Sequence, residues 1–510
     1  MPMTTRSTVR ELLDAGAAAA VALSAPDSAD LSYSALRQQI DETGAALRDI
    51  GIRPADRIGI VLPNGAEMAT AFLAVACAAT SAPLNPSYRA EEFEFYLSDL
   101  RARALVLRAG DPSPALDIAR KLAIPVLTLH PHPEQGAGRF TLDCTGISLG
   151  APATGEASGA DDAALVLHTS GTTSRPKIVP LSHRNVCASA RNIQRSCALT
   201  AADRGLNIMP LFHIHGLIAA VLAPLSAGGS VYCTPGFNAL KFFGWLEAAQ
   251  PTWYSAVPTM HQAILTRARS NAAIIAAHPL RFIRSSSSAL PVQVISELES
   301  VFGAPVIEAY GMTEAAHQMA SNPLPPAVRK PGTVGPAAGP DIAIMSEEGT
   351  LLAAGATGEI VIRGENVTAG YESNPKANAE AFVNGWFRTG DQGTMDADGY
   401  VAITGRLKEI INRGGEKISP REIDEVLMAH PAVLQVVTFA IPHAKLGEEV
   451  GAVVVLREGV QATEQQLREF VATRVADFKV PRKLLFLDEI PKGATGKLQR
   501  IGLAQKLGLT

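Results

Sequence analysis

Helical and strand patterns alternate along most of the 510 residues, and this alternation is the feature that most constrains the fold. Leu36, Ile40, Leu47 and Ile50 recur near the helical period of about 3.6 residues, and the strand-like run DRIGIVL follows at 56–62. Further strand-like runs are ALVL at 104–107, PVLTL at 125–129 and SVYC at 230–233. Strands that alternate with helices form largely parallel sheets covered by those helices. The sequence therefore predicts an α/β fold.

The pattern changes twice towards the C-terminus. From about Gly332 onward, short β-runs with glycine-containing turns, such as GEIVIRG at 358–364, predict a small β-barrel-like part. From Glu409 onward, helical segments mix with strand-like runs, and Ser419 before Pro420 is typical of a helix N-cap. A chain of this length is too long for one core. We therefore expect a large N-terminal domain of βα-layered sheets with the barrel-like part, and a smaller α+β C-terminal domain.

Composition and charge exclude several classes of protein. Hydrophobic residues make up 47% of the chain and charged residues 18%, as in a well-packed globular protein. The net charge of −4 provides no broad positive surface for nucleic acid, and no run of about 20 apolar residues could span a membrane. Glu11 and Asp14 precede the Ala-rich segment at 15–25, so we interpret this segment as a first helix and not as a targeting peptide.

The cysteines indicate a reducing compartment. They lie far apart and contain no CxxC pair: Cys77, Cys144, Cys187, Cys197 and Cys233. An odd number without that spacing argues against a disulfide framework and against a zinc site. We therefore expect a cytoplasmic protein.

A loop rich in hydroxyl groups follows a strand-like run at residues 168–177, which read HTSGTTSRPK. Gly171 allows backbone N–H groups to approach a ligand closely, and Lys177 supplies a positive charge. The loop lacks the GxxxxGK[ST] pattern of mononucleotide-binding loops. Taken alone, it predicts either a surface turn or a cradle for phosphate. Its hydroxyl donors are Thr169, Ser170, Thr172, Thr173 and Ser174.

Four later stretches follow this loop in order: EAYGMTEAAHQM (308–319), WFRTGD (386–391), GRLKEIINRGGEKISPREIDEVL (405–427) and PKGATGKLQR (491–500). Together with the loop, they resemble the adenylate-forming enzymes, a family of acyl-CoA synthetases, firefly-type luciferases and peptide-synthetase adenylation domains. The resemblance covers essentially the whole chain. It implies that ATP and Mg²⁺ activate a carboxylic acid as an acyl-AMP, and that CoA then captures the acyl group.

The resemblance implies a role for each of these motifs. Thr313 would hydrogen-bond the α-phosphate, Glu314 and Thr173 would bind Mg²⁺, and Lys497 would bridge the attacking carboxylate and the α-phosphate. Singly, each residue also has an ordinary structural explanation, such as a surface lysine for Lys497. The residues expected to bind ATP or AMP are Thr169, Ser170, Gly171, Thr172, Thr173, Ser174, Lys177, Glu308, Ala309, Tyr310, Asp391 and Arg406.

The resemblance also implies two domains that move between two half-reactions. Adenylation would use residues 1–405, the hinge would lie at 406–409 with Lys408 as its pivot, and residues 410–510 would form the mobile C-terminal domain. After rotation, the RGGEK stretch would reach the active site. Its residues Arg413, Gly414 and Gly415 would then border the narrow thiol arm of CoA.

The segments that form the acid site in this family are polar here. They read MPLFHIHGL (209–217), FIRSSSSALP (282–291) and AAHQM (315–319). Such residues favour a small acid with two charges, because a buried second carboxylate needs hydrogen bonds. A fatty acid or a cinnamate would need an apolar tunnel. The residues expected to contact the acid are His213, His215, Ser287, Ser288 and His317. Among the histidines, we expect contact from His317 and His213 before His215. Arg284 lies beside the serines in the sequence.

These same stretches, with RKPGTVG, resemble the oxalate–CoA ligases within the family, which carry alanine at the position of Gly311 in the plant and yeast enzymes. The expected reaction is therefore conversion of oxalate to oxalyl-CoA. Alternatives are a ligase for malonate or for a 4-coumarate-like aryl acid, and an adenylation enzyme that loads a carrier protein. We expect small-molecule substrates only, no nucleic acid or membrane partner, and a monomer or homodimer.

Overall fold

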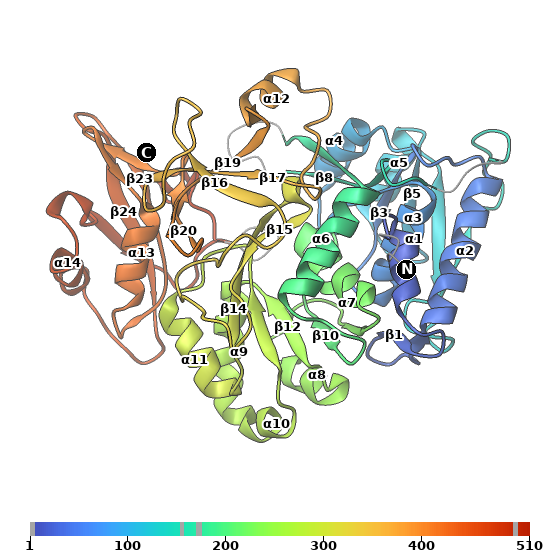
Figure 1. The fold of residues 1–510 in the computed structure, drawn as a ribbon, viewed down its shortest axis with the longest axis horizontal. Helices are drawn as coiled ribbons and strands as arrows, with labels where there is room; N and C mark the ends of the chain where they lie inside the picture. Colours follow the sequence, from blue (N-terminus) through green and yellow to red (C-terminus); the bar gives the residue numbers. More distant parts are fainter. Residues whose placement is uncertain (1–5, 154–157, 170–175, 493–497, 510) are drawn as a thin grey trace.

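The computed structural model describes residues 6–153, 158–169, 176–492 and 498–509. Within these residues, three sheets are formed by the chain up to Arg406 and one sheet by the chain after it (Figure 1). The longer helices are α2 (Tyr33–Asp49), α3 (Ala66–Ala78), α4 (Ala90–Leu100), α5 (Pro114–Lys121), α6 (His183–Ser196), α8 (Phe242–Ala249), α9 (Pro258–Ala268), α10 (Ala272–Ala277), α11 (Val292–Phe302), α12 (Pro375–Ala381), α13 (Pro420–Met428) and α14 (Glu464–Ala472).

The first sheet is mainly parallel, as the sequence predicts. Ile58, Ile60 and Leu105 are fully buried, because helices cover these inner strands. The strand of ALVL pairs in parallel with that of DRIGIVL on one side and with that of PVLTL on the other. The order of strands is β7 (Phe140–Asp143), β6 (Val126–Pro131), β5 (Ala104–Arg108), β3 (Arg57–Val61), β4 (Thr80–Pro83), β8 (Ala163–His168) and β9 (Ile178–Ser182).

The second sheet lies beside the first, and helices α3 and α6 contact strands of both sheets. Its inner strands are parallel, and β14 turns back into the antiparallel strand β15. The order is β15 (His317–Ser321), β14 (Val306–Met312), β13 (Phe282–Ser285), β12 (Trp253–Ala256), β10 (Arg204–Asn207), β11 (Ser230–Cys233), β1 (Val21–Ser24) and β2 (Leu31–Ser32). Parallel neighbours such as β12 and β13 bring residues that are far apart in the sequence into direct contact.

The expectation of an Ala-rich first helix at 15–25 is wrong. Residues 16–20 form turns, and Val21–Ser24 form strand β1, which pairs in parallel with β11. A β-carbon at Gly16 would lie 2.3 Å from the ring of Tyr33, so this glycine allows the tyrosine to pack against the turn. The hydroxyl of Tyr33 donates to the carbonyl of Gly229 at 2.7 Å. Tertiary packing therefore overrides the helix propensity of alanine.

The third sheet contains the β-rich region that the sequence places after Gly332. It is antiparallel, and β19 pairs with both β17 and β20. Its strands are β16 (Asp341–Met345), β17 (Thr357–Arg363), β19 (Trp386–Met395), β18 (Phe382–Val383) and β20 (Val401–Arg406). Strand β20 ends at Arg406, where the predicted hinge begins.

The C-terminal part has its own sheet, with helices α13 and α14 beside it (Figure 1). Ser419 is the residue before α13, but its side chain makes no cap hydrogen bond. Its hydroxyl instead donates to the carbonyl of Thr404, which joins the start of α13 to β20. The strands are β22 (Glu416–Ile418), β21 (Ile411–Arg413), β24 (Gly447–Leu456), β23 (Val433–His443) and β25 (Lys483–Phe486).

The C-terminal part packs against α9 and the segment that follows β13. The side chain of Gln262 donates to the carbonyl of Leu434 at 3.1 Å, and Gln435 donates back to Gln262 at 3.3 Å. A cavity of about 140 Å³ lies at this junction, and both Ser288 and Leu498 line it. The limits predicted for the two domains, 1–405 and 410–510, and for the hinge remain predictions. Among the described residues, no helix is both long and apolar enough to cross a membrane.

Candidate active site

Three predicted nucleotide residues meet where β14 approaches β19 and β20. Asp391 and Arg406 are paired across β19 and β20, and their side chains form an ion pair at 3.0 Å. The hydroxyl of Tyr310, from β14, donates to the other carboxylate oxygen of Asp391. Burial raises the pKa of Tyr310, and the neighbouring Asp391 raises it further. This group therefore presents an aromatic ring, a carboxylate and a guanidinium that are already held by one another.

A second group surrounds Glu314, which is 7% exposed. The hydroxyl of Tyr371 donates to its carboxylate at 2.8 Å, and the ammonium of Lys177 lies 4.1 Å from the centre of the Tyr371 ring. Burial raises the pKa of Glu314, although the Tyr371 hydroxyl and Lys177 oppose this rise. Tyr371 thus connects the end of the hydroxyl-rich loop to the buried carboxylate. Thr313 and Glu314 lie on the short helix Thr313–Ala315 that follows β14.

The predicted residues of the loop itself fall mostly outside the described part of the chain. This applies to Ser170, Gly171, Thr172, Thr173 and Ser174, and also to Lys497. Thr169 and Lys177 are described on either side of the loop, and their backbones pair at 2.9 Å. Leu498, the residue after Lys497, forms a bridge with Lys492.

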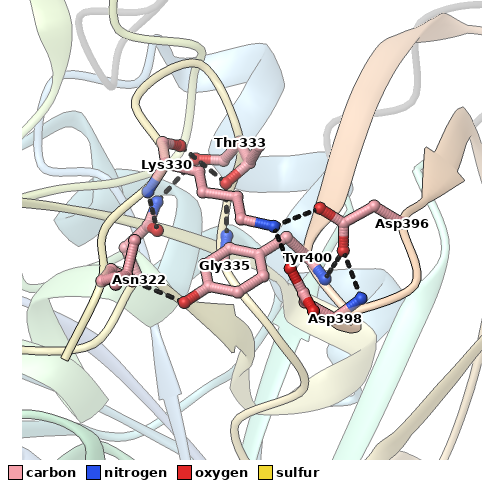
Figure 2. A network of polar contacts seen from close by, with 8 residues as sticks. Asn322, Lys330, Thr333, Gly335, Asp396, Asp398 and Tyr400 are labelled. Atoms are coloured by element: carbon pink, nitrogen blue, oxygen red, sulfur yellow. Dashed lines mark hydrogen bonds and ion pairs between the residues drawn. The ribbon is translucent and has the colours of Figure 1, made fainter.

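Glu308 and Ala309 lie on β14 before Tyr310, and a polar loop supports them. Glu308 accepts a hydrogen bond from the backbone N–H of Gly332 at 3.1 Å, and burial raises the pKa of Glu308 to about 8. Figure 2 shows how the loop is anchored: Lys330 donates to Asp396 at 2.6 Å and to Asp398 at 2.7 Å. These carboxylates belong to the turn between β19 and β20, so the loop connects Glu308 to the strands that carry Asp391 and Arg406.

Three of the five predicted acid residues, His215, Ser287 and His317, form another cluster at the other side of β14, whereas Ser288 lines the cavity at the junction with the C-terminal part. His215 and His317 are both buried, and their rings stack with centroids 4.9 Å apart. One ring nitrogen of His215 contacts Ser287 at 2.9 Å and the other contacts Ser255 at 2.7 Å. His213 is half-buried, and its Nδ1 accepts from the backbone N–H of His215 at 3.3 Å. The sequence analysis places His215 last among the three histidines, but the structure stacks its ring on that of His317.

Arg284 lies behind this histidine pair and is fully buried. Its guanidinium donates to His317 at 3.2 Å, to the amide oxygen of Gln318 at 2.9 Å and to Ser255 at 3.4 Å. Burial lowers the pKa of Arg284. We call Arg284, Ser255, His215, Ser287, His317 and Gln318 the acid-side cluster.

His317 sits close to Gly311 of the YGMTE motif. A β-carbon at Gly311 would lie 1.8 Å from the carbonyl oxygen of His317 and 3.1 Å from its Nδ1. The absence of a side chain at Gly311 permits this close approach. The cluster is therefore directly adjacent to the strand that carries Tyr310.

The predicted CoA and hinge residues are not members of the Asp391 group, the Glu314 group or the acid-side cluster. Arg413 forms an ion pair with Glu449 at 2.6 Å, and the N–H of Gly414 donates to Leu446, so these contacts stay within the C-terminal sheet. Gly414 and Gly415 form the turn between β21 and β22 with φ angles of 61° and 99°, which favour glycine. Lys408 is exposed.

Sequence reasoning missed three contributors. Tyr371, Ser255 and Gln318 carry no predicted role, and Arg284 is noted only as a neighbour of the serines. The one available signal for Tyr371 is its position in the turn-rich stretch TAGYESNP. Ser255 and Gln318 gain their roles only through pairing between strands, which the sequence does not display.

The donor set around Glu314 fits a magnesium ion better than a transition metal. No group of three or more His, Cys, Asp or Glu side chains able to hold a metal is present in the described ranges. Magnesium needs few protein ligands, since one carboxylate and the phosphate oxygens of a nucleotide can serve. A buried carboxylate with a raised pKa, such as Glu314, is stabilised as an anion by a cation beside it.

Comparisons with known proteins show the family to which the chain belongs. Residues 14–372 match the family model of AMP-binding enzymes, and 422–497 match the C-terminal domain of AMP-binding enzymes. The chain is 45% identical over 495 residues to the oxalate–CoA ligase of Arabidopsis thaliana, with 95% of each chain covered. It is 41% identical over 474 residues to the oxalate–CoA ligase of Saccharomyces cerevisiae, with 88% of this chain and 86% of the relative covered.

Solved structures agree with the fold as well. ATP-bound MatB from Rhodopseudomonas palustris superposes with a TM-score of 0.88 at 30% identity, and the match covers 98% of this chain and 99% of MatB. The expected α/β architecture with a smaller C-terminal part is thereby confirmed. The chain belongs to the family of AMP-binding enzymes, as one of its AMP-forming acid–CoA ligases.

Proposed function

We propose that this chain is an oxalate–CoA ligase. A carboxylate oxygen of oxalate attacks the α-phosphorus of ATP, the bond to the β-phosphate oxygen breaks, and oxalyl-AMP and pyrophosphate are formed. The thiolate of CoA then attacks the acyl carbonyl, and AMP leaves as the thioester forms. The names and the high coverage of the two relatives at 45% and 41% identity support oxalate as the acid.

The observation that carries this proposal is the cavity of about 140 Å³ between the two parts of the chain. Ser288, from the serine run beside the acid-side cluster, lines it together with Leu498, which directly follows Lys497. The chain on either side of the cavity therefore brings the acid-side segment close to the C-terminal lysine motif. This proximity is what adenylation by Lys497 requires, since a cation must reach the carboxylate and the α-phosphate together.

In this proposal each of the remaining residues binds a different part of ATP. Asp391 and Arg406 hold the ribose, Tyr310 faces the adenine, and Lys177 faces the outer phosphates. Asp391 suits the ribose because a carboxylate only accepts hydrogen bonds, and the two ribose hydroxyls donate them. Thr313 donates to the α-phosphate beside Glu314.

Ligases of this family use ATP, CoA and Mg²⁺. Glu314 would hold the magnesium ion together with Thr173, which lies outside the described residues. The ion supplies positive charge that offsets the negative charge of the triphosphate. We further propose that the enzyme is cytoplasmic and acts as a monomer or homodimer.

ATP–pyrophosphate exchange over a panel of acids tests the function. The panel contains oxalate, malonate, acetate and 4-coumarate, and chromatography of the thioester product follows with CoA present. We expect oxalate to give the highest kcat/KM for exchange and to yield oxalyl-CoA. Exchange that depends on another acid and not on oxalate would contradict the proposal. Exchange with oxalate but no thioester with free CoA would point to a carrier protein as the acceptor.

A further inference from the structure

Arg284 is a buried cation that lacks a neutralising partner within the described residues. It is fully buried on β13, no carboxylate forms an ion pair with it, and its Nε has no hydrogen-bond partner. Arg281, just before the same strand, differs, since it pairs with Asp203 at 2.9 Å near the surface. A buried charge without a counter-charge costs free energy. A bound anion would recover part of that cost.

The guanidinium fixes the tautomer of His317. An arginine can only donate hydrogen bonds, so the Nε2 of His317, which Arg284 contacts at 3.2 Å, must accept with its lone pair. The ring is then neutral, and its one proton lies on Nδ1. The position of a β-carbon on Gly311 lies 3.1 Å from this Nδ1. His317 therefore presents an N–H donor beside the strand of the YGMTE motif.

Arg284 also orients His215 and Ser287, and it does so through Ser255. Arg284 approaches the oxygen of Ser255 at 3.4 Å, so the hydroxyl proton turns away towards the ring nitrogen of His215 at 2.7 Å. His215 then carries its proton on Nδ1 and donates to Ser287 at 2.9 Å. Ser287 has a φ angle of 73°, a conformation that serine seldom adopts and that is often retained for function. Because the Ser287 oxygen accepts from His215, its hydroxyl proton remains a donor for another group.

We propose that Arg284 determines specificity for an acid with two negative charges. It keeps a proton on Nδ1 of His317, leaves the hydroxyl of Ser287 as a donor, and supplies positive charge behind both groups. A second carboxylate accepts both donors, whereas an uncharged amide in its place would carry its own N–H groups and no charge. Arg284 acts through its neighbours and is thus a positioning residue. The inference rests on the proposed function, since it takes oxalate as the acid.

The test compares oxalate with oxamate, in which an amide of the same shape replaces one carboxylate. Arg284→Met removes the charge at similar length, and Arg281→Met, just before the same strand, is the matched control. Arg284→Met should lower kcat/KM for oxalate about 30-fold, mostly through KM, while kcat/KM for oxamate stays within about threefold. The KM for ATP should not change. Arg284→Lys should recover part of the preference for oxalate, and Arg281→Met should leave the ratio of the two acids unchanged.

Equal losses for both acids in Arg284→Met, or an unchanged ratio, would overturn the proposal. If that variant does not fold, Ser255→Ala decides, because it removes one atom and keeps the charge. We expect Ser255→Ala to reduce the oxalate-to-oxamate ratio about threefold, and an unchanged ratio would overturn the proposal.

The outcome for the wild-type enzyme separates this inference from the proposed function. If the wild type does not use oxalate but does use malonate, the proposed function is wrong, and the same comparison is made between malonate and its half-amide. If the wild type prefers a monocarboxylate, both ideas fail.

Discussion

The nucleotide side and the acid side of β14 differ in whether their buried charges have partners. On the nucleotide side, Asp391 pairs with Arg406, and Glu314 accepts a hydrogen bond from Tyr371 with Lys177 close by. On the acid side, Arg284 is buried and has no carboxylate among its described neighbours. The first side is therefore organised before any ligand arrives, while the second gains stability when an anion arrives. ATP binding and acid selection should respond to different mutations.

The largest effect should come from Lys497, which is proposed to act on both sides. Lys497→Ala should reduce adenylate formation by roughly a thousandfold, because its ammonium is proposed to contact the carboxylate and the α-phosphate together. It should largely spare thioester formation from supplied oxalyl-AMP. ATP–pyrophosphate exchange measures the first step, and release of oxalyl-CoA measures the second. An equal loss in both steps would refute a role limited to the first.

Asp391→Asn tests the nucleotide side alone. It removes the counter-charge of Arg406, so the KM for ATP should rise about 30-fold, with little change in the KM for oxalate. Tyr310→Phe is the matched control, since it removes only the hydroxyl that donates to Asp391. Its effect should be smaller. A comparable rise in the KM for oxalate would show that the two sides are coupled.

His317→Ala tests the acid side. It should cost about tenfold more in kcat/KM for oxalate than for acetate, since only oxalate has a second carboxylate to lose a donor. The KM for ATP serves as the internal control and should stay constant. An unchanged ratio between the two acids would remove His317 from the acid site.

Tyr371→Phe tests the nucleotide side through the pH dependence of the rate. Burial already raises the pKa of Glu314, and the Tyr371 hydroxyl lowers it, so loss of the hydroxyl should raise this pKa further. Because Glu314 is proposed to bind magnesium as an ionised carboxylate, the acidic limb of the rate–pH profile should move to higher pH. The apparent KM for Mg²⁺ should rise about threefold. A profile that does not move would separate Tyr371 from the function of Glu314.

The smallest effect on activity should come from Glu308→Gln. Its expected effect is on the free energy of unfolding. Burial raises the pKa of Glu308 to about 8, above its usual value near 4.5. The folded protein therefore holds a proton that the unfolded chain has released, and stability falls as the pH rises through this interval. At pH 8.5 the variant should exceed the wild type by about 2 kcal/mol in free energy of unfolding, with little difference near pH 5. Urea unfolding at the two pH values measures this, and a constant difference would show that Glu308 does not titrate as expected.

The sequence predicts the fold and the nucleotide side because both depend on local patterns. Runs such as DRIGIVL become buried parallel strands, and the order of the motifs carries Tyr310, Asp391 and Arg406 to one place. The acid side depends instead on strand register. Ser255 and Arg284 are direct partners across β12 and β13, and this pairing cannot be deduced from the two runs alone. The burial that gives Arg284 its importance is likewise a tertiary property.

The missing side chain at Gly311 has a consequence for redesign. The carbonyl of His317 lies 1.8 Å from where a β-carbon would stand, so even a single methyl group would displace this carbonyl and swing the imidazole with it. An engineer who wished to transplant this placement of His317 into another ligase would therefore have to move Gly311 with it. A ligase with alanine at this position has to place the carbonyl of its histidine elsewhere.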